Sequence, residues 1–161
     1  MIIVGYPGIG KTTISGRKTG CIDLESSLFH SQELEDWFVT YCELAFKLSK
    51  DGFIVMVSSH EDVVKQLKKY YADYTEIYVI CPHPNIKYQW IYRLLKRYEK
   101  MPSDKNFRAF QRAKKHFDED IHDLIWSGLD GGTVTSTDYD LMNVIVGIKN
   151  FYLNSQELQG S

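Results

Sequence analysis

Apolar residues in this chain form short continuous runs that alternate with longer stretches of helical spacing. The short runs, rich in β-branched side chains, lie at 1–4, 21–24, 53–57, 76–80 and 133–135. The run at 53–57, Phe-Ile-Val-Met-Val, is typical of a central parallel strand covered on both faces. We predict that these runs are the strands of one sheet.

Helical spacing fills the intervals between the runs. In residues 33–50, apolar side chains recur every three or four positions, as in a helix packed on one face. The other predicted helices lie at 12–18, 60–71, 86–100, 104–126 and 139–153. Strands separated by helices imply crossover connections, so we predict an α/β fold with a mainly parallel sheet and helices on both faces. No linker, repeat or low-complexity segment divides the chain, so residues 1–161 are interpreted as one domain.

The most specific motif follows the first predicted strand. Residues 5–12 read Gly-Tyr-Pro-Gly-Ile-Gly-Lys-Thr, which is the G-x-x-x-x-G-K-[ST] pattern of the phosphate-binding loop, or P-loop. Its glycines let successive backbone N–H groups point into one concavity that fits a triphosphate. We expect Lys11 to reach the β- and γ-phosphates of ATP and the Thr12 hydroxyl to bind Mg²⁺. The expected nucleotide-binding residues are Gly5, Tyr6, Pro7, Gly8, Ile9, Gly10, Lys11, Thr12 and Thr13.

A phosphate-binding loop indicates what is bound but leaves the reaction open. Guanine-specific switches usually carry an Asn-Lys-x-Asp element, which this sequence lacks. Motor ATPases need an apolar strand that ends in Asp-Glu, whereas the run at 53–57 is followed by Ser58, Ser59 and His60. Both observations favour a phosphotransferase. A P-loop ATPase, or a nucleotide-binding module without a small-molecule acceptor, is the alternative.

Asp23 is the best placed candidate for a catalytic carboxylate. It ends the second predicted strand, and ligands of doubly wound sheets bind at the carboxyl ends of the strands. A carboxylate there can orient an acceptor hydroxyl, take its proton and support Mg²⁺. Glu25, two positions further on, would point the same way along a strand and is the next candidate. The plainer alternatives are a turn-capping Asp23 and a solvated Glu25.

The acceptor pocket is expected between Asp23, the start of the helix at 33–50 and residues 58–60. Ser59 and His60 are open candidates for this site, although a histidine there is more often a capping residue. The nearby aromatic residues could stack on a base, but a place in the core is the favoured interpretation. These residues are Phe29, Trp37 and Tyr41.

Arg93 and Arg97 are the candidate catalytic cations. They are four positions apart in the predicted helix 86–100, so both guanidinium groups project from one face. Two arginines that face the loop from a helix would clamp the transferring phosphoryl group. An amphipathic helix with a basic, solvated face is the alternative.

Composition narrows the class of protein further. Hydrophobic residues make up 43% and charged residues 25%, which are average values for a globular protein. The net charge of −2 gives no electrostatic case for an obligatory nucleic-acid partner, although it allows a local basic groove. Three widely spaced cysteines are interpreted as buried, reduced thiols of a cytoplasmic protein. No apolar run approaches the length of a membrane span.

The chain resembles the adenylate kinase-like branch of the P-loop kinases, which includes nucleoside and nucleotide kinases and the kinase domain of polynucleotide kinases. The phosphate-binding loop, Asp23 and the arginine pair occur in that family's order, and segments 90–94 and 117–121 are similar to small phage and bacterial members. The resemblance implies a three-layer P-loop NTPase fold with a five-stranded parallel sheet and a short helical lid over about 93–108. It also implies a magnesium–ATP donor, and a nucleoside, nucleotide or 5′-hydroxyl as the acceptor.

Two departures from the family bear on the acceptor. Ser58 and Ser59 stand where the family usually has a carboxylate at the end of the third strand. No monophosphate-binding arginine pattern follows the second predicted strand. Both departures argue against a nucleoside monophosphate kinase, and a nucleic-acid 5′ end is not the favoured acceptor.

Overall fold

Five parallel strands form the centre of the molecule. The structure is a computed structural model that describes residues 1–16, 18–30 and 35–160. The strands are β1 (Ile2–Gly5), β2 (Cys21–Asp23), β3 (Ile54–Ser58), β4 (Ile77–Pro82) and β5 (Asp130–Val134). Their order in the sheet is β2-β3-β1-β4-β5, and every neighbouring pair is parallel. The predicted α/β class and five-stranded parallel sheet are therefore confirmed.

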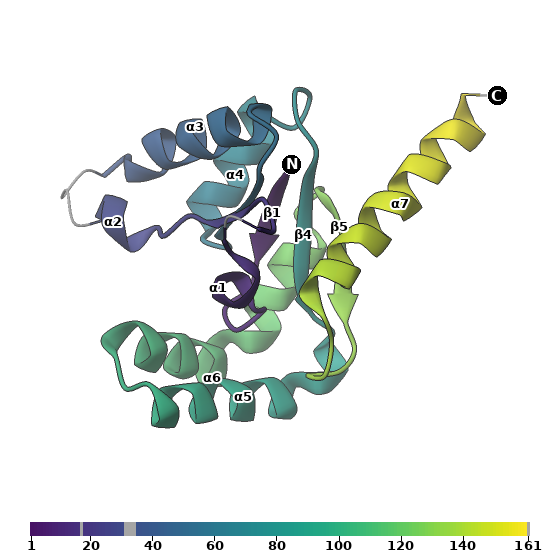
Figure 1. The fold of residues 1–161 in the computed structure, drawn as a ribbon. Coiled ribbons are helices and arrows are strands. Elements are labelled where there is room, and N and C mark those ends of the chain that lie inside the picture. The colour runs from purple at the N-terminus through teal and green to yellow at the C-terminus, as the bar shows by residue number, and fades with distance from the viewer. Residues whose placement is uncertain (17, 31–34, 161) are drawn as a thin grey trace.

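Helices flank this sheet, as Figure 1 shows: α3 and α4 lie on one side and α7 on the other, while α5 and α6 run next to each other beyond the tips of the strand arrows. The prediction of helices on both faces is confirmed. The helical elements are α1 (Lys11–Ile14), α2 (Ser27–His30), α3 (Trp37–Lys50), α4 (Glu61–Tyr70), the 3₁₀ turn η1 (Pro84–Ile86), α5 (Lys87–Lys100), α6 (Asp104–Ile125) and α7 (Leu141–Gln159).

The sheet is buried because its central strands are apolar on both faces. Every residue of β1 and β4 is buried, as expected of parallel strands covered by helices. The longer helices each bury an apolar face: α4, for example, buries Val63, Val64 and Leu67.

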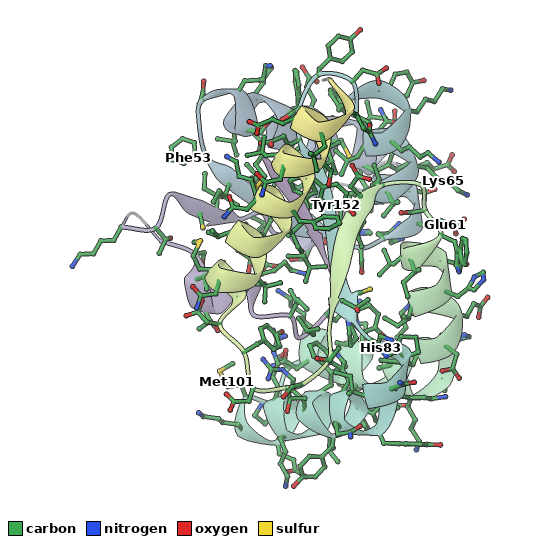
Figure 2. The ribbon with its side chains drawn as sticks, turned by 90° about the vertical axis from the view of Figure 1, so that its right-hand side faces the viewer. Phe53, Glu61, Lys65, His83, Met101 and Tyr152 are labelled. Carbon is green, nitrogen blue, oxygen red and sulfur yellow. The ribbon has the colours of Figure 1, made fainter. Side chains whose placement is uncertain are left out.

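Tyr152 fixes α7 to the edge strand β5 (Figure 2). Its hydroxyl accepts from the N–H of Gly131 and donates to the carbonyl of the same residue, both at 3.1 Å. Its ring stacks on Tyr78 of β4, with 5.5 Å between the centroids. A Cβ on Gly131 would lie 2.1 Å from the carbonyl oxygen of Val79, so only glycine fits this approach of β5 to β4.

The helices near the start of the chain differ from the prediction. The helix predicted at 12–18 ends at Ile14, because Ser15 is extended and the Gly16 N–H donates to the Cys21 carbonyl at 3.0 Å. The short helix α2 was not predicted, since it has no repeated apolar spacing. Positions 33 and 34 of the helix predicted at 33–50 lie outside the described residues; the helix is described from Trp37.

Several boundaries later in the chain also differ. Strand β4 continues through Pro82, which pairs with Val134 at the end of the β4–β5 ladder. The strand predicted at 133–135 begins at Asp130. The prediction placed it too late because two glycines interrupt the apolar pattern of this strand. Helix α7 runs past 153 to Gln159.

The three cysteines, Cys21, Cys42 and Cys81, are buried thiols, as predicted. Burial raises the pKa of Cys42 and Cys81 to about 12, so both remain neutral at physiological pH. In the part of the chain that the structure describes, no helix combines the length and the apolar character that a membrane span requires.

Candidate functional site

A cavity of about 850 Å³ lies at the carboxyl ends of the strands, between the sheet and the α5–α6 pair. Its walls come from parts of the chain that are far apart in sequence. The glycine-rich loop 5–12, the segment 23–26 and Ser58–Ser59 line the side of the sheet, and the facing sides of α5 and α6 line the other. The cavity therefore collects most of the predicted site residues.

The loop needs its glycines for local reasons. Gly8 and Gly10 have φ angles of 86° and 104°, in the left-handed region that favours glycine. A Cβ on Gly5 would lie 2.8 Å from Cγ2 of Ile9, because the loop curls tightly back on β1. The glycines of the motif are therefore required by the backbone conformation of the loop, as predicted.

Three side chains from distant elements hold three consecutive carbonyls of this loop. Trp90 Nε1 donates to the Pro7 carbonyl at 2.9 Å, and Arg93 Nε donates to the Gly8 carbonyl at 3.0 Å. The Tyr139 hydroxyl donates to the Ile9 carbonyl at 2.7 Å. We call Trp90, Arg93 and Tyr139 the loop brace. By fixing these carbonyls, the brace holds the loop in one conformation.

Arg93 is the centre of the loop brace. Its Nη1 also donates to the Thr137 carbonyl at 2.9 Å. Its guanidinium lies 5.3 Å from the ring of Trp90 and 5.7 Å from that of Tyr139, and these two rings are nearly parallel. Arg93 thus lines the cavity as predicted, but two of its nitrogens are bonded to backbone carbonyls.

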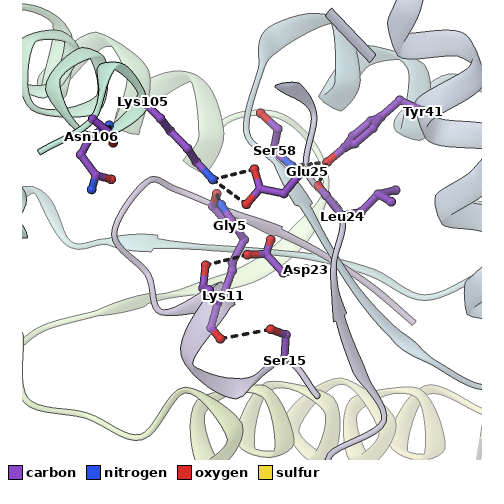
Figure 3. A network of polar contacts seen from close by, with 12 residues as sticks. Gly5, Lys11, Ser15, Asp23, Leu24, Glu25, Tyr41, Ser58, Lys105 and Asn106 are labelled. Atoms are coloured by element: carbon purple, nitrogen blue, oxygen red, sulfur yellow. Dashed lines mark hydrogen bonds and ion pairs between the residues drawn. The ribbon is translucent and has the colours of Figure 1, made fainter. Parts of the chain in front are cut away.

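Lys11 lies at the start of α1 with its ammonium turned back onto the loop. Its Nζ donates to the Gly5 carbonyl at 2.7 Å (Figure 3). Burial lowers the pKa of Lys11 to about 8, and the nearby carboxylate of Asp23 partly opposes this shift. The ammonium is therefore poorly solvated, and an anion beside it would favour its charged form.

Thr12 and Asp23, the predicted Mg²⁺ pair, are in direct contact. The Thr12 hydroxyl donates to Asp23 Oδ2 at 2.8 Å, beside Lys11 in the same cavity. Figure 3 labels Asp23 and Lys11. No group of three or more His, Cys, Asp or Glu side chains in the described ranges could hold a metal alone. Mg²⁺ commonly uses only one or two carboxylates together with substrate phosphates, so a hydroxyl and a carboxylate suit it.

Glu25 also lines the cavity, and it is paired. Lys105 Nζ, from the first turn of α6, donates to both of its carboxylate oxygens at 2.5 and 2.6 Å (Figure 3). The side chain of Glu25 is thus partly exposed and also ion-paired. The pair connects α6 to the segment that follows β2.

Tyr41 connects the carboxyl ends of β2 and β3 through its hydroxyl. Its hydroxyl donates to the Leu24 carbonyl at 2.7 Å and accepts from the Ser58 N–H at 2.9 Å. Tyr41 and Trp37 are buried, and Phe29 packs edge-on against Tyr41. Since none of these three rings lines the cavity, their predicted place in the core is confirmed.

The remaining candidates are divided between the cavity and its surroundings. Ser59 and Arg97 line the cavity; in residues 1–16, 18–30 and 35–160, the guanidinium of Arg97 makes no hydrogen bond or ion pair. Tyr6 does not line the cavity, because its ring is buried against Phe117. His60 caps α4, with Nδ1 accepting from the Asp62 N–H, as the capping alternative predicted.

Sequence reasoning missed two features of this site. The loop brace joins positions more than 80 residues apart, which no local pattern reveals. The additional basic side chains of the cavity did have a signal, because Lys105, Arg108 and Arg112 have the spacing of one helical face. The basic residues that were missed are Lys96, Lys100, Lys105, Arg108 and Arg112.

No protein-family model matches this sequence, and the search of curated proteins gives no significant match. The fold and the cavity define the protein as an α/β protein with a five-stranded, all-parallel sheet and a largely basic cavity at the carboxyl ends of its strands.

Proposed function

We propose that this protein is an ATP- and Mg²⁺-dependent phosphotransferase of the P-loop kinase type, which transfers the γ-phosphate to a nucleoside, a nucleotide or a 5′-hydroxyl. One observation carries the proposal: Thr12 and Asp23 are in contact at 2.8 Å beside Lys11, on a glycine-rich loop that opens into a basic cavity. Groups suited to phosphate, to Mg²⁺ and to the acceptor's proton thus share one space.

The loop and Lys11 would hold the donor. The loop brace keeps the backbone in place, so little ordering is needed when the triphosphate binds. Lys11 would exchange its bond with the Gly5 carbonyl for the β- and γ-phosphates. Arg97 would add a second cation from α5, whereas Arg93 would act mainly by holding the loop.

Thr12 and Asp23 would hold Mg²⁺, which when bound neutralises charge on the β- and γ-phosphates. Their hydroxyl and carboxylate oxygens are the ligand types that Mg²⁺ prefers.

Asp23 would orient the acceptor hydroxyl and take its proton as the new oxygen–phosphorus bond forms. The bond between the γ-phosphorus and the bridging oxygen breaks, and ADP leaves with the electron pair. Lys11 and Arg97 would stabilise the charge that develops during transfer. Glu25 is the weaker candidate for the base, because Lys105 already neutralises it.

The test is an ADP-release screen against nucleosides, nucleotides, 5′-hydroxyl oligonucleotides and sugars, combined with calorimetry of magnesium–ATP binding. Lys11→Ala removes a charge-assisted contact of about 1.5–3 kcal/mol, so ATP should bind roughly tenfold weaker or worse. Lys65→Ala is the matched control, since Lys65 pairs with Glu61 on the exposed face of α4.

Two results would contradict the proposal. One is wild-type protein that binds neither ATP nor GTP in the presence of Mg²⁺. The other is rapid ATP turnover that no acceptor stimulates, which would favour the ATPase alternative.

A further inference from the structure

The lining of the cavity is strongly basic although the chain as a whole is slightly acidic. Among the residues that the structure describes, eight Lys and Arg residues line the cavity, but only two acidic residues do, namely Asp23 and Glu25. A concave site lined by one sign of charge concentrates ligands of the opposite sign. The eight are Lys11, Arg93, Lys96, Arg97, Lys100, Lys105, Arg108 and Arg112.

These cations extend along the cavity well beyond the glycine-rich loop. Lys11 and Arg93 lie at the loop itself, which follows the central strand β1. Lys105 instead contacts Glu25, which follows the edge strand β2, and β3 separates β2 from β1 in the sheet. The turn between α5 and α6 therefore lies on the β2 side, beneath α2 in Figure 1. This is the end of the cavity where the acceptor pocket was expected.

Protein acids do not neutralise all of these side chains. Three of the pairs are Lys96 with Glu99, Lys105 with Glu25, and Arg112 with Asp120. The charged side-chain groups of the other three cations near the turn make no hydrogen bond or ion pair within the described part of the chain. We call these three, Arg97, Lys100 and Arg108, the tip cations.

The donor alone does not account for this charge. A triphosphate is about half neutralised by its Mg²⁺ and would already meet the loop amides, Lys11 and Arg97. Lys100 and Arg108 then remain, on α5 and α6, facing the acceptor end of the cavity. The charge of Glu25 is already balanced by Lys105, which donates to both of its oxygens.

We propose that the acceptor carries a phosphate group of its own, which Lys100 and Arg108 bind at the tip of the α5–α6 pair. The inference rests on the proposed phosphotransferase function and names the substrate class for that same cavity. The phosphate can belong to a mononucleotide or to the first phosphodiester of an oligonucleotide with a free 5′-hydroxyl. Neutral nucleosides and sugars lack the group that these two cations recognise.

The test is a binding measurement that does not depend on turnover. With Mg²⁺ and a saturating non-hydrolysable ATP analogue present, calorimetry compares each common nucleoside with its 5′-monophosphate, its 3′-monophosphate and a short 5′-hydroxyl oligonucleotide. At least one phosphate-bearing ligand should bind about tenfold or more tightly than its nucleoside. The best monophosphate and the oligonucleotide, compared at equal salt, identify the source of the phosphate.

Variants test whether Lys100 and Arg108 cause the preference for phosphate-bearing ligands. Lys100→Gln combined with Arg108→Gln should remove most of the phosphate preference and change the affinity for the ATP analogue far less. Lys115→Gln, also exposed on α6 but outside the cavity, should keep the preference.

Three outcomes would overturn the inference: a neutral nucleoside that binds as tightly as its phosphates, a double variant that keeps the preference, or no binding by any phosphate-bearing ligand. A phosphate-bearing ligand that binds as expected but never yields ADP with ATP present would instead overturn the phosphotransferase function. The two failures are therefore distinguishable.

Discussion

Replacing Tyr139 by phenylalanine tests whether the loop brace determines nucleotide affinity. The Tyr139 hydroxyl donates to the Ile9 carbonyl at 2.7 Å. Phenylalanine would keep the ring, its near-parallel neighbour Trp90 and the contact with the Arg93 guanidinium. The substitution therefore removes one hydrogen bond and little else.

The size of the effect follows from that bond. A neutral hydrogen bond contributes about 0.5–1.5 kcal/mol, and leaving the carbonyl of the buried Ile9 without this donor raises the loss to about 1–2 kcal/mol. This loss of about 1–2 kcal/mol is also the upper limit of the effect on ATP binding. The affinity falls only in proportion to the fraction of molecules in which the loop has left its braced conformation. We expect the free energy of unfolding to fall by about 1–2 kcal/mol and the Kd for magnesium–ATP to rise roughly three- to tenfold.

Tyr152→Phe is the matched control. It also removes a hydroxyl bonded to backbone, at Gly131 of β5 rather than at the loop. Urea unfolding should give a similar loss of stability for both variants, while calorimetry should show weaker ATP binding for Tyr139→Phe alone. If Tyr139→Phe loses stability but binds ATP as the wild type does, the brace supports the fold and has no role in binding.

Three further predictions concern the loop and its carboxylate. Since the pKa of Lys11 is lowered to about 8 and phosphate favours the ammonium, ATP affinity should be constant below pH 8 and weaken above it. Calorimetry in two buffers above pH 8 should show proton uptake on binding, and Lys11→Ala should abolish it. Asp23→Asn should lower kcat by about 10²–10⁴ with little change in ATP affinity, measured by ADP release with the acceptor once identified. Alanine strains the backbone at both Gly8 and Gly10, whose φ angles are +86° and +104°. Gly8→Ala also places a Cβ 2.8 Å from Cδ2 of the buried Leu94, so thermal unfolding should show a larger loss than for Gly10→Ala, whose Cβ has ordinary contacts.

The parts of the fold that could be predicted depend on local patterns. The continuous apolar run at 53–57 and the helical spacing after residue 37 each reflect burial of one segment, which the sequence records directly. The end of α1 was missed because it depends on the Gly16–Cys21 pairing, a contact between two segments. Strand β5 was placed too late because Gly131 is required by the backbone of Val79 and so interrupts the apolar signal.

In the candidate site, too, residues set by local sequence could be predicted and contacts between distant segments could not. The loop glycines and Lys11 could be predicted because the backbone conformation is imposed within eight residues. Asp23 could be placed because the carboxyl ends of parallel strands share one edge. Arg93 was assigned to phosphate from its helical spacing alone, but spacing says nothing of Gly8 and Thr137, whose carbonyls bind it.

Net charge illustrates why position matters more than composition at such a site. A net charge of −2 gave no electrostatic case for an obligatory nucleic-acid partner and only allowed a local basic groove, because a sum over the chain carries no information on where the charges lie. The fold brings cations from α1, α5 and α6 onto one cavity and leaves most carboxylates elsewhere. Helical spacing would have predicted part of this arrangement, since Lys105, Arg108 and Arg112 share one face of α6. Lys100 lines the same wall of the cavity only because α5 packs against α6. Under the proposed function, acceptor specificity would depend on how these two helices pack. Substitutions at the turn between α5 and α6 should then change the affinity for a phosphate-bearing acceptor more than the affinity for ATP.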